Sequence, residues 1–184
     1  ALQIPMFGLY GACSTSGEAL ALASMSAAAG YGGTMIAVTS SHFGSAEKEF
    51  RFPLGYANQR PLSSHWTVTG SGAFLVQSAE EYRKQNTKSY FSNIRITGVT
   101  VGKIVDYGLK DSQNMGACMA PAAMDTIVQN FQDMERKEKD YDRIITGDLG
   151  SIGRTILFDL IREKGYDICE KPVSYTHLRA HETR

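Results

Sequence analysis

The chain has 184 residues, 42% of them hydrophobic, and it carries 19 Lys and Arg against 19 Asp and Glu, so its formal net charge is zero. This length and composition are those of an ordinary globular protein. The balanced charge argues against a nucleic-acid-binding protein, which normally presents a basic face, and no apolar run approaches the roughly 20 residues that span a bilayer.

The first predicted elements are a helix and a strand. Residues 14–29 are small or apolar except for Glu18, which predicts a helix buried on all sides that stops at the glycines from Gly30 onward. The continuous apolar run 34–39 predicts a strand that is covered on both faces.

The middle of the chain is predicted to contain more β structure. Residues 42–66 resemble a loop, and 71–77 predict a second strand. Residues 78–93 are polar and predict a plain connection. In 94–104 apolar and polar residues alternate roughly, which predicts a further β region.

A second half is predicted to begin near Asp111. The spacing of apolar residues predicts a helix from about 120 to 134 and an amphipathic helix at 151–164 that ends at Gly165. Residues 142–146 between them predict a strand. Since helices alternate with strands, the sequence indicates the α/β class with a layered core.

The last twelve residues, 173–184, differ from everything before them. They contain His177 and His181 and show neither a helical nor a strand period. The string resembles translated adapter sequence, so we predict a non-native tail that belongs to neither fold nor site. A metal site at the two histidines is the alternative.

Three cysteines, Cys13, Cys118 and Cys169, are widely spaced and form no C-x-x-C pair, so neither a zinc site nor a disulfide framework is indicated. Reduced thiols are expected, and no metal or cofactor is predicted. Cys13 directly precedes the first predicted helix. The macrodipole and the free N–H groups at a helix N-terminus favour a reactive thiolate. A buried cysteine that only fills space is the alternative.

Several motifs resemble known families. Gly11 to Gly17 with the following helix, glycines and strand resembles the nucleophile region of thiolases and type III ketoacyl synthases. Met115 to Ala123 is similar to the Met-Gly-x-Gly-Pro stretch that helps line the acyl pocket of thiolases; a plain helix start with Pro121 in its first turn is the alternative. The chain as a whole resembles the stage V sporulation protein AD family over residues 1 to about 172, on the strings 10–15, 40–43, 46–53, 66–72, 115–123 and 146–150.

This resemblance implies a thiolase-like layered αβαβα fold that is truncated at both ends. Residues 1–110 are then the end of the N-terminal half, and 111–172 the start of the C-terminal half. About the first third of the protein and a C-terminal portion are expected to be missing.

The resemblance also implies a function. Members of the family are understood to bind dipicolinic acid, free or as its calcium salt, for uptake into the developing spore. They are thought to act with membrane proteins of the stage V sporulation operon. We therefore expect a homodimer of cytoplasmic type, peripheral on the spore inner membrane, that binds no nucleic acid.

The resemblance places Cys13 at the nucleophile position, and Met115 and Met119 in the lining of a ligand pocket. Asp148 stands where ketoacyl synthases carry a histidine, and an ionised carboxylate cannot donate a hydrogen bond to an oxyanion. Cysteine-dependent acyl transfer of the ketoacyl synthase III or thiolase type is therefore the alternative function. A carboxylate at the N-terminus of the next helix is the alternative role for Asp148.

Three further residues are candidates for binding the dianion. His42 is the loop histidine nearest to a predicted site element, and a structural hydrogen bond is its alternative role. Arg51 or Arg60 could form a bidentate clamp on a carboxylate, with a plain surface position as the alternative.

Overall fold

The computed structural model describes residues 3–42, 69–85, 94–104, 106–111, 114–169 and 172–174. These residues form two compact units, one built from the described residues up to Thr97 and the other from Gly98 onward. Helices and strands are mixed along the chain, which confirms the α/β class. The thiolase-like layering and the predicted division between residues 110 and 111 stay predictions.

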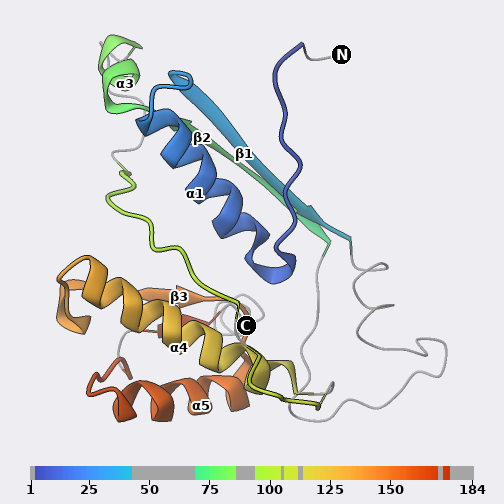
Figure 1. The fold of residues 1–184 in the computed structure, drawn as a ribbon, viewed down its shortest axis with the longest axis vertical. Coiled ribbons are helices and arrows are strands. Elements are labelled where there is room, and N and C mark those ends of the chain that lie inside the picture. Colours follow the sequence, from blue (N-terminus) through green and yellow to red (C-terminus); the bar gives the residue numbers. More distant parts are fainter. Residues whose placement is uncertain are drawn as a thin grey trace, which may run out of the picture. The chain divides into compact units, whose positions relative to one another are not determined.

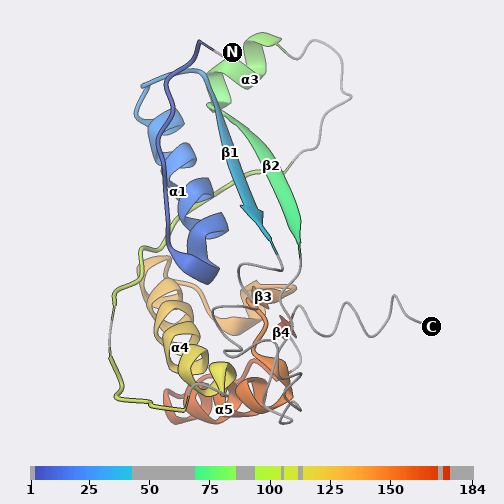
Figure 2. The ribbon, with the colours of Figure 1, turned by 90° about the vertical axis from the view of Figure 1, so that its right-hand side faces the viewer.

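The first unit consists of helix α1 (Thr15–Ala28) beside an antiparallel ribbon of strands β1 (Thr34–Ser41) and β2 (Gly70–Gln77), as both ribbon views show (Figures 1 and 2). A short 3-10 turn, η1 (Ala12–Ser14), leads into the helix. Gly30, with φ of +79°, ends the helical stretch as predicted, since this left-handed conformation suits a residue without Cβ. The predicted helix and both strands are therefore confirmed.

Alanines make the closest packing of this unit. Ala19 and Ala27 of α1 and Ala37 of β1 are 3–6% exposed. Side chains of this size let the helix approach the ribbon closely, which accounts for the alanine-rich composition that predicted a packed helix.

The prediction that α1 and β1 are covered on all sides is wrong for the described part of the chain. On α1, Leu22 and Met25 are 37% and 45% exposed. On the ribbon, Ile36 pairs with Leu75, and the two are 60% and 63% exposed. One helix and a two-stranded ribbon enclose a single internal face, so the outer face of each element remains open to solvent.

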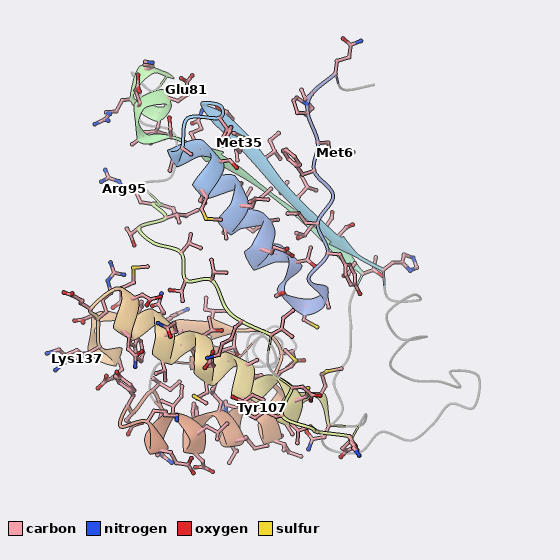
Figure 3. The ribbon with its side chains drawn as sticks, viewed as in Figure 1. Met6, Met35, Glu81, Arg95, Tyr107 and Lys137 are labelled. Atoms are coloured by element: carbon pink, nitrogen blue, oxygen red, sulfur yellow. The ribbon has the colours of Figure 1, made fainter. Side chains whose placement is uncertain are left out.

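A short helix, α3 (Ala79–Gln85), lies in the stretch that the sequence predicted as a plain connection. The Ser78 hydroxyl accepts a hydrogen bond from the Glu81 N–H at 3.1 Å and so caps the first turn. The Glu81 side chain lies against Gly33, where an added Cβ would be 2.9 Å from its Cγ (Figure 3). Ser followed three residues later by Glu is a known helix-start signal that the polar composition obscured.

The β region predicted at 94–104 is wrong, because these residues pair with no strand in the described part of the chain. Residues 98–103 instead form a strap, an extended segment that lies along helix α4 (Met115–Asp133). The Asn130 side-chain amide donates to Thr100 Oγ1 at 2.8 Å, and Lys103 pairs with Asp125 at 3.1 Å.

Glycines let the strap approach the helix on either side of Thr100. An added Cβ on Gly98 would lie 2.5 Å from Met134 Cε, and one on Gly102 would lie 3.3 Å from Thr126 Oγ1. Two residues of extended chain advance about 6.6 Å and four residues of helix about 6 Å, so every second strap residue meets every fourth helix residue. This match of the two repeats explains why residues of the strap alternate in character although the strap belongs to no sheet.

The second unit contains α4, a 3-10 turn η3 (Glu138–Asp140), β3 (Ile144–Thr146), α5 (Gly150–Glu163) and β4 (Pro172–Ser174). Helices α4 and α5 lie side by side (Figures 1 and 2). Strands β3 and β4 pair in parallel with α5 as their crossover, as a parallel pair requires. The core consists of residues from both helices and their connections, namely Ala120, Met124, Phe131, Leu149, Leu157, Ile161 and Ile168.

Helix α4 begins earlier than predicted. The Asn114 side chain accepts a hydrogen bond from the Ala117 N–H at 3.1 Å and caps the helix before Met115. Pro121 therefore lies inside the helix and is buried, so the alternative that placed Pro121 in the first turn is wrong. A proline at this position leaves the carbonyl of Ala117 without its usual N–H donor.

The helices of the described ranges include none that is long and apolar enough to cross a membrane. The predicted tail begins inside β4, which includes residues 173 and 174, and residues 175–184 lie outside the described part. The tail remains a prediction.

Candidate functional site

Cys13 lies in turn η1 at the start of α1, and it is exposed. In the described part of the protein, Cys13 is therefore not the buried, space-filling cysteine of the alternative interpretation. The positive end of the macrodipole of a 14-residue helix follows it directly. Strand β1 ends at the same end of the unit (Figures 1 and 2), which places His42, the exposed residue after β1, at that end too.

Two hydroxyls hold the turn around Cys13. Ser14 Oγ donates to the Gly11 carbonyl at 2.6 Å. Thr15 Oγ1 accepts from the Gly11 N–H at 3.0 Å and donates to the Ala12 carbonyl at 2.8 Å. Ala12 itself has φ of +47°, a left-handed conformation that costs a residue with a Cβ about 1 kcal/mol or more. The hydroxyls thus stabilise a strained backbone directly before Cys13.

A carboxylate lies against the same turn. An added Cβ on Gly11 would be 2.6 Å from Glu18 Oε2, so Gly11 is the residue that lets Glu18 fold back over the turn. Glu18 occupies the first turn of α1, where the macrodipole favours a negative charge. Any acidic ligand that binds at the Cys13 turn must do so in the presence of this charge.

In the second unit, Asp148 lies in the loop between β3 and α5. Its Oδ1 accepts a hydrogen bond from the Gly150 N–H at 3.0 Å. This is the geometry of a carboxylate at a helix N-terminus, one of the two roles considered for Asp148. The pocket role stays a prediction. Met119 packs over the same loop, since its Cε is 3.1 Å from the position of a Cβ on Gly147.

The N-terminal turns of α4 and α5 touch through their backbones. An added Cβ on Gly116 would overlap the Leu149 carbonyl oxygen and lie 3.0 Å from Gly153 Cα. Met115, the first residue of α4, and Met119 one turn later therefore lie close to the loop that contains Asp148. The structure brings these three predicted residues into one neighbourhood.

The other predicted residues are distributed differently. Cys13 and His42 belong to the first unit, whereas Met115, Met119 and Asp148 belong to the second. Arg51 and Arg60 lie outside the described residues. Within the described ranges no three His, Cys, Asp or Glu side chains gather in a group that could hold a metal ion.

A third polar group lies at the end of α5. Arg162 Nη2 donates to Cys169 Sγ at 2.8 Å, and Asp167 Oδ1 accepts from the Cys169 N–H at 3.0 Å. The hydrogen bond with the Asp167 carboxylate, with a smaller effect of burial, raises the pKa of the Cys169 thiol. The backbone N–H of Cys169 lowers the pKa of Asp167.

The comparison with known families matches residues 1–176 to the model of stage V sporulation protein AD. The chain belongs to this family. Stage V sporulation protein AD of Bacillus subtilis (strain 168) is 43% identical over 170 residues, which are 92% of this chain and 47% of that relative. The chain therefore spans about half the length of this curated relative. The predicted family is confirmed, and membership supports a role in sporulation.

Three features of the Cys13 turn in this AD-family chain were not predicted: the left-handed Ala12, the hydrogen bonds of Thr15 and the position of Glu18. A glutamate in the first turn is an ordinary helix-start signal, and it could have drawn attention to Glu18. The conformation of Ala12 leaves no signal in the sequence, because alanine rarely adopts it.

Proposed function

We propose that this chain is part of a thiolase-like protein that binds dipicolinic acid for uptake into the developing spore, with the Cys13 turn as the floor of the pocket. The observation that supports it is the exposed, hydroxyl-braced turn at the N-terminus of α1. A helix N-terminus offers N–H donors and a positive potential to a carboxylate. Dipicolinate is flat and carries two carboxylates, so one of them can accept these hydrogen bonds.

The proposed partners are a second copy of the protein and the membrane proteins of the stage V sporulation operon, with a peripheral position on the spore inner membrane. The segment before the turn supports a protein contact. Met6 and Phe7 are 90% and 83% exposed, and Figure 3 shows the Met6 side chain on the extended N-terminal segment. Exposed apolar residues grouped in this way are typical of interaction surfaces.

Calorimetric titration with dipicolinate tests the binding. Thr15→Val removes both hydrogen bonds of the Thr15 hydroxyl at nearly constant volume, and it should weaken binding by up to about thirtyfold, since each of the two bonds contributes about 1 kcal/mol. Thr15→Ser keeps the hydroxyl and is the matched control. No heat at millimolar dipicolinate, or equal affinities for the two variants, would contradict the proposal.

Acyl transfer by Cys13 is the second candidate, and the strained Ala12 directly before Cys13 favours it, since such strain gathers at active sites. The test is the rate of iodoacetamide labelling at neutral pH, followed by mass spectrometry of the peptide with Cys13. A catalytic Cys13 should react much faster than exposed Cys118 in the same chain. Equal rates for the two thiols argue against this candidate.

A further inference from the structure

The strap, residues 98–103, is held on α4 by side chains and leaves its own backbone open. The Tyr141 hydroxyl donates to Asn130 Oδ1 at 2.6 Å, and Asn130 Nδ2 donates to Thr100 Oγ1 at 2.8 Å. In contrast, no backbone hydrogen bond joins the strap to another residue of the described ranges. The strap is therefore a fixed, extended segment whose N–H and C=O groups are available to a partner, as those of an edge strand are.

The side of the strap that faces away from α4 is apolar. Since Thr100 and the neighbouring glycines face α4, Val101 faces the other way, and it is 74% exposed. In a sheet, such a side chain is covered by the residue opposite it on the adjacent strand, whose Cβ lies about 5 Å away. A second strand beside the strap would cover Val101 and pair the open backbone groups at the same time.

A hollow of about 290 Å³ lies next to the strap, between it, α4 and the chain that leads into β3. It adjoins the strap at Thr100, and its apolar lining includes Ile127, Phe131 and Ile144. This volume is just below the roughly 300–1,000 Å³ of small-molecule sites. The hollow suits one apolar side chain of a strand added beside Thr100, because residues opposite each other in a strand pair point to the same side.

Arg143 gives the hollow a positive charge. The described lining includes no acidic residue, and none of the side chains that the structure describes forms an ion pair with Arg143. A guanidinium binds a carboxylate through charge-assisted hydrogen bonds. Side chains two positions apart point to the same side of a strand. Charge complementarity therefore favours a strand with an acidic residue two positions from its apolar one.

We propose that the strap and the hollow bind an extended peptide segment of a partner protein, with an apolar anchor and an acidic residue two positions apart. The backbone of the segment pairs with the strap, the anchor enters the hollow, and the acidic side chain binds Arg143. In binding of this kind, main-chain hydrogen bonds provide affinity and pockets for alternate side chains provide specificity. The site lies in the second unit and does not rest on the function proposed for the Cys13 turn.

Titration of the 184-residue chain with the peptide acetyl-Thr-Glu-Val-Leu-Val-Thr-amide, followed by amide chemical shifts in NMR, tests the proposal. The peptide should shift the amides of residues 98–103 and of Arg143. Replacement of its leucine by alanine should weaken binding about tenfold or more, because the burial of the anchor is lost. Arg143→Gln should weaken binding about tenfold, and replacement of the peptide's glutamate by glutamine should then have no further effect. Arg83→Gln in α3, the matched control, should leave the affinity unchanged.

Methylation of single backbone nitrogens of the peptide tests the strand pairing. Successive N–H groups of a strand point to opposite edges, so methylation of the leucine nitrogen and of the preceding valine nitrogen should differ, with only one of them weakening binding strongly. The proposal is overturned if both methylated peptides bind as the parent does, if the alanine peptide binds equally well, or if no shift occurs at millimolar peptide. Self-association of the chain that excess peptide reverses, measured by sedimentation, would assign the site to a second copy and would also overturn it.

Discussion

Gly116 and Gly17 occupy equivalent positions in two helices but have opposite surroundings, so the same substitution should change stability in opposite directions. Each lies in the first turn of its helix. An added Cβ on Gly17 meets nothing within 4 Å, whereas one on Gly116 meets backbone atoms of Leu149 and Gly153. Alanine is favoured over glycine in a helix by about 1 kcal/mol, so Gly17→Ala should stabilise by up to about that amount.

For Gly116→Ala the same gain is offset by overpacking, which typically costs about 1–3 kcal/mol. The neighbours are backbone atoms, which cannot rotate away as a side chain can, so the cost should lie near about 3 kcal/mol. The net result is a destabilisation of about 2 kcal/mol, confined to the contact between α4 and α5.

Hydrogen exchange measured by mass spectrometry reports the change in stability segment by segment. This resolution is needed because the two units need not unfold together. A loss of about 2 kcal/mol should accelerate exchange in α4 and α5 about thirtyfold, and exchange in α1 should not change. Gly17→Ala should slow exchange in α1 by up to about fivefold. If Gly116→Ala protected α4 as Gly17→Ala protects α1, the backbone contact between α4 and α5 would be refuted.

Three other predictions follow from single contacts. Glu18→Gln should raise dipicolinate affinity about fourfold at low salt, because the Glu18 carboxylate and a ligand carboxylate about 5 Å apart in water repel each other by about 0.8 kcal/mol. Calorimetry at low and high salt measures this affinity. An unchanged affinity would place the ligand elsewhere. Gly98→Val should push the flexible end of the Met134 side chain aside and loosen this end of the strap, which faster hydrogen exchange in 98–103 would show, whereas unchanged exchange would contradict the contact between Gly98 and Met134. Asp167 raises the pKa of the Cys169 thiol, so the alkylation rate of Cys169 should have its pH midpoint above that of an ordinary thiol. Asp167→Asn should lower this midpoint. An unchanged midpoint would exclude Asp167 as the cause.

The elements with a strong local pattern were predicted from the sequence. Helix α5 has an apolar stripe and ends at Gly165, whose φ is +86°, so its face and its end followed from spacing and composition alone. The strap was mispredicted because an apolar residue at every second position shows only that one side of an extended chain packs against a neighbour, and it does not identify that neighbour. In a sheet that neighbour is another strand, but here it is α4, and only the three-dimensional packing distinguishes the two.

The local structure around the candidate residues was predicted in part, and their roles stay predictions. Cys13 and its helix follow from local sequence, and the two methionines with Asp148 follow from the family resemblance. The contact of Glu18 with Gly11 depends on the rotamer of the Glu18 side chain, and the φ of Ala12 depends on the hydrogen bonds of the Ser14 and Thr15 hydroxyls. Neither the rotamer nor the φ angle can be predicted from a pattern of residue types.

Glu18 bears on the binding of a ligand at the Cys13 turn. A helix N-terminus carries about half a positive charge, and one carboxylate already exceeds it. The proposed ligand, dipicolinate, can arrive with its own cation, as the calcium salt, and place its second carboxylate away from Glu18. A ligand at this turn therefore meets the Glu18 carboxylate, and the proposed binding of dipicolinate should be stronger in the presence of calcium than in its absence.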